Sequence, residues 1–141
     1  MKLFQLNRET YINVNRIVAV MVKAHEISNK APKKNFRVTV EVQDSNYYGA
    51  YSRVTREQAE GLMEQLVGKI NAERSEQLTI LGDVAIGVRE IVGAYIERDG
   101  KDTWRVMLDS ARDNYFVQEE MPRLEAEKLL AQVVGRIEAT A

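Results

Sequence analysis

Cations and aromatic side chains alternate over one stretch of the first half of the chain, and this is the pattern with the most chemical content. The stretch begins with Lys23 and His25 and continues through a set of candidate ligand contacts: Lys30, Lys33, Lys34, Arg37, Asn46, Tyr47, Tyr48, Tyr51, Arg53 and Arg56. Cations neutralise phosphate groups, and aromatic rings stack on bases for about 1 to 3 kcal/mol per base. The pattern indicates a surface for single-stranded nucleic acid or a nucleotide-like anion. Tyrosines are also common in half-buried strands, and a lysine-rich loop can serve solubility alone.

Part of this pattern recurs 68 residues further along the chain. Asn46-Tyr47-Tyr48 returns as Asn114-Tyr115-Phe116 (114 − 46). The asparagines can adopt the left-handed conformation of a turn, which is a sufficient structural reason for the motif. If ligand binding has retained it, the two copies would form symmetric pockets at a lobe or subunit interface, with Arg112 and Arg123 holding an anion in the second. The candidate ligand contacts of the second half are therefore Arg112, Asn114, Tyr115 and Arg123.

Groups that could do covalent or metal chemistry are sparse. His25 is the only histidine and there is no cysteine, so a Ser–His–Asp triad or a His/Cys metal site lacks members. The carboxylate pairs Glu119-Glu120 and Asp99/Asp102 could do acid–base work or hold a divalent ion, but their place in turns favours solvated charge. We expect no catalytic residues, no metal and no cofactor, and thus a protein that is not an enzyme.

Strand-like runs must position the candidate contacts. In the range Phe36–Val42 every second residue is apolar, while Arg37, Thr39 and Glu41 point to the other face. The run over residues 17–22 is apolar at every position. It predicts a strand covered on both faces, by a helix on one and by a neighbouring lobe or subunit on the other.

Each half closes with a sequence typical of an amphipathic helix. Thr55 and Gln58 fit a capping box, in which each side chain bonds the backbone N–H of the other residue. Pro122 marks the first turn of the second helix, where its missing N–H costs least. The apolar stripes are Ala59, Leu62, Met63, Leu66, Val67 and Ile70 in the first helix and Ala126, Leu129, Leu130, Val133, Val134 and Ile137 in the second.

These elements occur twice. Phe36-Arg37-Val38 returns as Trp104-Arg105-Val106 at a spacing of 68 (104 − 36), and Val67-Gly68-Lys69-Ile70 as Val134-Gly135-Arg136-Ile137 at 67 (134 − 67). Repetition at this period indicates two copies of one small unit. We predict the α+β class, as a tandem (ββββα)2 repeat with antiparallel sheets that are each covered by one C-terminal helix. The first lobe would span residues 1–72 and the second 77–141, packed with pseudo-twofold symmetry as one compact unit, because so small a unit is marginally stable alone.

Charge is distributed unevenly between the halves. Residues 1–70 hold 11 Lys and Arg against 7 Asp and Glu, a net charge of +4, and residues 71–141 hold 9 against 14, a net charge of −5. The asymmetry could steer copies together head to tail, or make the first lobe meet an anionic partner, or it could be drift on solvated faces. No apolar run approaches the length of about 20 residues that spans a bilayer, and the N-terminus becomes polar too early for a secretory signal. We expect a cytoplasmic protein without a membrane partner.

Two resemblances follow from these elements. Leu6-Asn7, the stretch from Tyr11 to Ile17 and the helix from Thr55 resemble the FlbD-type flagellar protein domain, which implies a tandem of small FlbD-like ββββα domains. By element order alone, the doubled plan is similar to the Whirly, PUR-repeat and transcriptional positive-cofactor group, whose members bind single-stranded nucleic acid on curved sheets. The acidic pI of about 5.9 departs from that group and argues against non-specific backbone binding.

We interpret the chain as a non-catalytic binding protein that acts as a homo-oligomer, with single-stranded nucleic acid or a nucleotide-like small molecule as its ligand. The first alternative is a protein–protein adaptor, regulatory or of viral origin, that uses the all-apolar strands as an interface. An enzyme is the second alternative and the one that the residues favour least.

Overall fold

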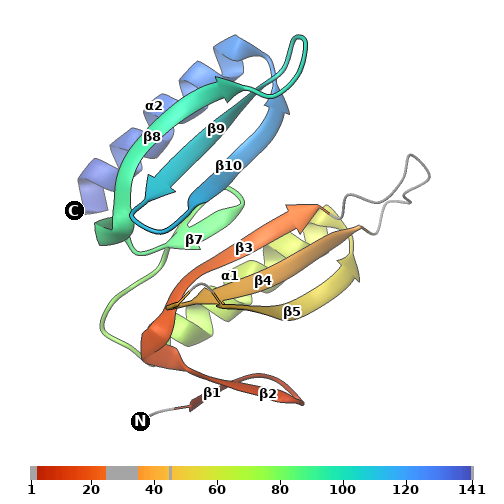
Figure 1. Ribbon diagram of the computed structural model, residues 1–141, viewed down its shortest axis with the longest axis vertical. Coiled ribbons are helices and arrows are strands. Elements are labelled where there is room, and N and C mark those ends of the chain that lie inside the picture. Colours follow the sequence, from red (N-terminus) through yellow and green to blue (C-terminus); the bar gives the residue numbers. More distant parts are fainter. Residues whose placement is uncertain (1–2, 25–34, 45, 141) are drawn as a thin grey trace.

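The computed structural model describes residues 3–24, 35–44 and 46–140, which form ten strands and two α-helices. The first lobe consists of β1 (Leu3–Asn7), β2 (Thr10–Asn13), β3 (Ile17–Ala24), β4 (Phe36–Val42), β5 (Asn46–Val54) and α1 (Arg56–Ala72). The second lobe consists of β6 (Thr79–Leu81), β7 (Val84–Ile86), β8 (Ile91–Arg98), β9 (Trp104–Ser110), β10 (Asn114–Met121) and α2 (Arg123–Thr140). Figure 1 shows one helix packed along the sheet of each lobe.

The class is α+β with antiparallel sheets, as the sequence predicts, but each half holds five strands and not four. In the first half, the additional strand results from a break between β2 and the apolar run of β3. A short 3-10 helix, Val14–Arg16, separates the two strands, and the side chain of Asn13 caps it by accepting the backbone N–H of Asn15 at 3.0 Å. Such a local bond competes with the sheet ladder and ends the strand.

The sheets do not follow the two halves of the sequence. A five-stranded sheet has the order β5-β4-β3-β7-β6, a three-stranded sheet has the order β10-β9-β8, and within the described residues β1 and β2 pair with each other alone. The β6–β7 hairpin therefore extends the sheet of the first lobe. The β1–β2 hairpin makes no matching contact with β8, so the strand pairing does not show the twofold relation expected between the lobes.

Strand β3 lies between the two cores of the molecule (Figure 1). Its residues 17–22 are at most 7% exposed. Val20 and Val22 belong to the core beneath α1, whereas Ala19 and Met21 belong to the core of the second lobe. This confirms the prediction that an all-apolar strand is covered on both faces, and it shows that the second cover is the neighbouring lobe.

The two helices begin as predicted but are buried to different extents. The capping box of Thr55 and Gln58 is formed, and α1 buries five residues of its stripe, namely Ala59, Met63, Leu66, Val67 and Ile70. Helix α2 follows Pro122 directly and fully buries Ala126 and Val133 of its stripe. The remaining stripe residues of α2 are partly exposed because the sheet beneath this helix has three strands and covers less of it.

Gly82 closes the β6–β7 turn against β10. Its φ is 67°, and a Cβ atom at this position would lie 2.3 Å from the carbonyl oxygen of Val117. The next residue, Asp83, donates its backbone N–H to the same carbonyl at 2.8 Å. A glycine is needed here because both the backbone conformation and the close approach exclude a side chain.

We expect Gly82→Ala to lower the free energy of unfolding by about 2 kcal/mol. An alanine would be strained at this positive φ, and its Cβ atom would also clash with Val117. Denaturation in urea measures the change. The control is Gly68→Ala on α1, where a Cβ meets nothing within 4 Å; it should raise stability by up to about 1 kcal/mol. Equal effects of the two substitutions would contradict this description of the turn.

Candidate anion-binding face of the first lobe

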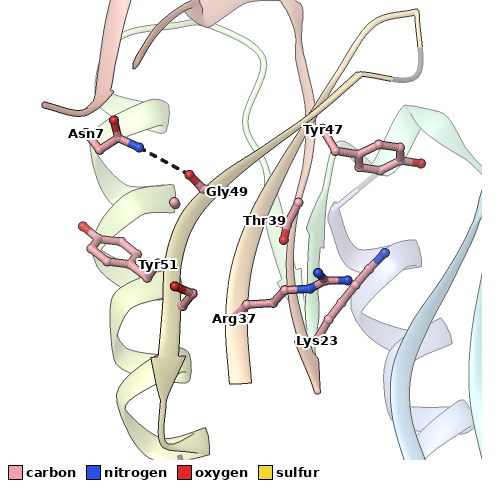
Figure 2. Close-up of a pocket in the computed structure, with 9 residues that line it drawn as sticks. Asn7, Lys23, Arg37, Thr39, Tyr47, Gly49 and Tyr51 are labelled. Carbon is pink, nitrogen blue, oxygen red and sulfur yellow. Dashed lines mark hydrogen bonds between the residues drawn. The ribbon is translucent and has the colours of Figure 1, made fainter. Parts of the chain in front are cut away.

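The second lobe covers part of the first-lobe sheet face that lies opposite α1, and we call the part that it leaves open the outer face. This outer face carries an open groove of about 720 Å³. Lys23 of β3, Arg37 and Thr39 of β4, and Tyr47 and Tyr51 of β5 line it (Figure 2). The alternation along β4 turns Arg37 and Thr39 to this face, because Val38 and Val40 occupy the core under α1. The pleat thus directs Lys23, Arg37 and Thr39 to the groove. Tyr51 lines it as well although it pairs with Val38, at a point where the β4–β5 ladder shifts register.

Lys23 and Arg37 form the electrostatic centre of the groove. They stand directly opposite each other in the antiparallel ladder of β3 and β4, so their side chains share a face, as Figure 2 shows. No carboxylate lines the groove among the residues that the structure describes. Like charges directly opposite each other destabilise a sheet. An anion bound between these two cations would remove the repulsion.

The second lobe has a neutral pair at the corresponding place. Glu97 of β8 lies opposite Arg105 of β9, and the guanidinium donates to the carboxylate. Arg105 also stacks on the ring of Phe116, 4.8 Å from its centroid. The second lobe thus satisfies its own cation, whereas the first lobe presents two cations to an outside group.

Tyr47 and Tyr51 supply the aromatic surface of the groove, with 45% and 37% of their areas exposed. The ammonium group of Lys23 lies 5.5 Å from the centroid of the Tyr47 ring. The Tyr47 hydroxyl donates to a carboxylate oxygen of Asp113 at 2.5 Å, and this bond, together with burial, raises the pKa of Tyr47. The hydroxyl is therefore protonated at neutral pH, and the ring face is the part left for a ligand.

The β1–β2 hairpin and Gly49 shape the end of the groove. Asn7, at the end of β1, donates its side-chain N–H to the carbonyl oxygen of Gly49 at 3.3 Å (Figure 2). Sequence reasoning did not single out these two residues or Thr39 as groove residues. The glycine inside a strand was the one signal, since such a residue often marks a place where another group approaches the backbone.

The structure brings three of the predicted contacts of the first half into the groove, Arg37, Tyr47 and Tyr51. Lys30, Lys33 and Lys34, like His25, lie outside the described residues. Asn46 and Arg53 are exposed at the start and near the end of β5. The remaining two predicted contacts of the first half are Tyr48 and Arg56.

Tyr48 lies directly opposite Val40 and so takes the face that α1 covers. Arg56 begins α1, donates to Asp83 at 2.8 Å and 3.2 Å, and stacks on the ring of Phe36. Neither side chain lines the groove.

The predicted contacts of the second half do not come together. Arg112 is exposed in the turn before β10, whereas Arg123 follows β10, stacks on the Trp104 ring at 4.6 Å and pairs with Glu127 at 3.0 Å. Asn114 is exposed at the start of β10. The two arginines thus lie at opposite ends of one strand and cannot clamp one small anion.

Tyr115 joins the two lobes. It is 2% exposed, and its hydroxyl donates to Glu41 of β4 at 2.5 Å. Tyr115 stands opposite Leu108, and Tyr48 stands opposite Val40, so the ladders match Tyr115 with Tyr48. The sequence motif instead aligns Tyr115 with Tyr47, and this one-residue difference puts the aligned tyrosines on opposite faces of their sheets.

Comparison of the chain with models of known protein families, with curated proteins and with solved structures gives no match. The resemblances to the FlbD-type domain and to the Whirly and PUR group therefore stay predictions. In the described part of the chain neither helix is long and apolar enough to cross a membrane. Within the same residues, no three His, Cys, Asp or Glu side chains are grouped so that they could hold a metal ion.

The buried Glu41 makes stability depend on pH. Burial raises the pKa of Glu41, an effect that the hydrogen bond from Tyr115 opposes. The folded protein therefore holds the Glu41 proton more tightly than the unfolded chain, in which the pKa is about 4.5. The stability contributed by this group is complete below that pH and is lost as the pH rises through the raised pKa.

We expect Glu41→Gln, which keeps an acceptor for Tyr115, to flatten the decline of the unfolding free energy as the pH rises above about 4.5. Urea denaturation across this range measures the slope. The control Glu64→Gln changes an exposed residue of α1 and should keep the slope of the unaltered protein. An unchanged slope in Glu41→Gln would show that Glu41 does not bind this proton.

Proposed function

We propose that the chain is a cytoplasmic, non-catalytic binding protein whose first lobe binds single-stranded nucleic acid or a nucleotide-like anion on its outer sheet face. The observation that carries this proposal is the pair of Lys23 and Arg37, opposite each other in the ladder and without a carboxylate in the described lining of the groove. A phosphate group between them would accept charge-assisted hydrogen bonds from both. The exposed residues Tyr47 and Tyr51 both line the groove, where a base can stack on an aromatic ring.

The second part of the proposal is that the two lobes are copies of one unit. Strands β3 and β8 begin 74 residues apart (91 − 17), β4 and β9 begin 68 apart (104 − 36), and α1 and α2 begin 67 apart (123 − 56). Both ladders shift register at the same place, between Ile17 and Ala19 and between Ile91 and Gly93. These matches support a duplication after which one lobe carries two facing cations and the other a closed ion pair. One ligand site per chain follows.

A role in self-association is the second candidate, and it needs a free apolar strand. Strand β3 is buried on both faces and so offers no such surface. Its counterpart β8 is partly exposed along its length, with Val92 73% exposed. This difference favours β8 over the buried strands as the surface on which a homo-oligomer would form.

We expect Lys23→Glu to reproduce in the first lobe the ion pair that Glu97 and Arg105 form in the second. Binding of a fluorescein-labelled oligodeoxythymidylate, followed by anisotropy at about 50 mM salt, should weaken at least about tenfold because a phosphate contact is lost. The free energy of unfolding should rise by about 0.2 to 1 kcal/mol because a repulsive cross-strand pair becomes attractive. The opposite signs of the two changes separate a lost contact from misfolding.

Lys128→Glu is the control, since it makes the same change of charge at an exposed position of α2. It should leave both binding and stability close to those of the unaltered protein. If the unaltered protein binds neither the oligonucleotide nor a mononucleotide at low salt, the proposed ligand class is wrong. If both variants weaken binding equally, net charge rather than the groove is responsible.

A further inference from the structure

The joint between the two lobes has a recognisable set of contacts. Strand β7 adds to the edge of β3 with Val20 opposite Ala85, and the backbone N–H of Val22 donates to the carbonyl oxygen of Asp83 at 2.8 Å. The carboxylate of Asp83 accepts two hydrogen bonds from Arg56. The joint thus has a receiving side, formed by β3 and the start of α1, and an inserting side, formed by the β6–β7 hairpin.

Arg56 is held in place for this contact by two further groups of the receiving side. Its guanidinium lies 4.9 Å from the centroid of the Phe36 ring and 3.3 Å from the carboxylate of Glu60, one helical turn further on. These two contacts orient the Arg56 side chain toward the carboxylate of Asp83.

The receiving side recurs in the second lobe without an occupant. Arg123 begins α2 as Arg56 begins α1, stacks on Trp104 at 4.6 Å and pairs with Glu127 at 3.0 Å. Strand β8 ends its sheet, so among the described residues its outer edge pairs with no strand. Among the described residues, the ion pair of Arg123 is with Glu127, the counterpart of Glu60, and no acid takes the place that Asp83 has at Arg56.

The inserting side recurs at the start of the chain as the β1–β2 hairpin, which pairs with no other described strand. The β1–β2 hairpin turns through two residues, Arg8 and Glu9, as β6–β7 turns through Gly82 and Asp83. At the spacing of 74 (83 − 9), Glu9 takes the place of Asp83. The outer edge of β2 pairs with no other strand of the described chain, and Tyr11 on it is 57% exposed.

We infer that copies of this chain assemble head to tail, with the β1–β2 hairpin of one copy adding to the β8 edge of the next, as β6–β7 adds to β3 within each chain. The occupant of the β8 edge is thus a second copy. Exposed strand edges pair readily with another strand, which makes this addition a known mode of association. The opposite charges of the two halves, +4 and −5, bring the basic end of one copy to the acidic end of another.

The contacts within the chain give the register between copies. The spacing of 74 places Gly93, Ala94 and Tyr95 of one copy opposite Ile12, Tyr11 and Thr10 of the other. Glu9 of the hairpin then meets Arg123, which completes the acid-and-arginine contact. In the joint between copies, Ala94 takes the place of Val20 and Tyr11 takes the place of Ala85. The larger residue of the inserting hairpin therefore meets the smaller residue of the receiving strand.

Tyr48 and Asp109 supply a further pair. Within the chain Tyr115 donates to Glu41, and the ladders match Tyr48 with Tyr115 and Asp109 with Glu41. Tyr48 of one copy would therefore donate to Asp109 of the other. Its 37% exposure, against 2% for Tyr115, fits a residue whose covering lobe belongs to another molecule.

A head-to-tail joint leaves one free hairpin and one free edge after every addition, so the assembly grows until it closes into a ring or continues as a filament. Sedimentation velocity should show a mass above the 16.1 kDa of one chain that increases with protein concentration. Glu9→Arg and Arg123→Glu should each shift the assembly toward the monomer by at least about tenfold in dissociation constant, because each places like charges together. The double variant with both changes should regain the assembly.

Glu138→Arg and Lys128→Glu are the matched controls, because they reverse exposed charges of α2; both should assemble like the unaltered protein. A monomer at every concentration would overturn the inference. So would single variants that assemble normally, or a double variant that stays as weak as either single one.

A disulfide tests the register, since the chain has no cysteine of its own. Residues directly opposite in antiparallel strands have Cα atoms about 4.5 to 5.5 Å apart, which a disulfide spans. Tyr11→Cys combined with Ala94→Cys should therefore give a ladder of linked chains on a non-reducing gel. Val20→Cys with Ala85→Cys, the matching pair within one chain, should close without a ladder, and Tyr11→Cys with Lys128→Cys should give no ladder. The proposed register would be contradicted if Tyr11→Cys with Ala94→Cys gave no ladder. It would also be contradicted if only Tyr11→Cys with Lys128→Cys gave one.

This inference rests on the proposed duplication and not on the proposed ligand. The assembly variants leave Lys23 and Arg37 untouched, and Lys23→Glu leaves the hairpin and the β8 edge untouched. An unaltered protein that assembles but binds no oligonucleotide would therefore reject the ligand alone, and an unaltered protein that binds but stays a monomer would reject the assembly alone.

Discussion

The burial of β3 on both faces and along both edges is the constraint on which the rest of the structure depends. Each face belongs to a different hydrophobic core, and β4 and β7 occupy the two edges. Burying a Val, Ile or Met side chain contributes about 1.5 to 3 kcal/mol, so exposing one face by separating the lobes would cost several such contributions. The two lobes are small, and this shared strand lets each complete the core of the other.

Polar contacts then specify how the lobes meet. Glu41 points away from α1, as the alternation of β4 requires, and it is 1% exposed because the second lobe covers it and Tyr115 donates to it. Arg74, in the connection between the lobes, donates to the carbonyl oxygens of Val14 at 3.0 Å and Ile17 at 2.7 Å. A buried polar group without a partner costs about 1 to 3 kcal/mol, so these bonds exclude other arrangements of the lobes.

The lobes have the same order of elements, but they differ in how their charges and their strand edges are paired. The first lobe carries two facing cations on its outer sheet face, whereas the second pairs Arg105 with Glu97. In the first lobe β7 pairs with the edge of β3, whereas no described strand pairs with the outer edge of β8 in the second. The proposed ligand surface and the proposed assembly edge thus lie on different lobes, so that each can be changed without the other.

The sequence by itself determined the elements and their faces. The capping box at Thr55, the stripe of α1, the outward position of Arg37 and the covering of residues 17–22 all follow from local spacing, because side-chain direction repeats with a fixed period in helices and strands. Candidate groove residues could be read from the same alternation. The 3-10 helix over residues 14–16, which begins at the cap made by Asn13, was not among the predicted elements.

Only the tertiary structure decided which strands pair and what each outward face meets. Nothing local shows that β7 joins β3 or that Glu41 lies beneath Tyr115, because both depend on contacts between residues more than 60 positions apart. The aligned tyrosines 47 and 115 show the same limit. A shift of one residue in strand pairing reverses the face of every side chain, and that register is set by packing between distant segments rather than by the residues next to each tyrosine.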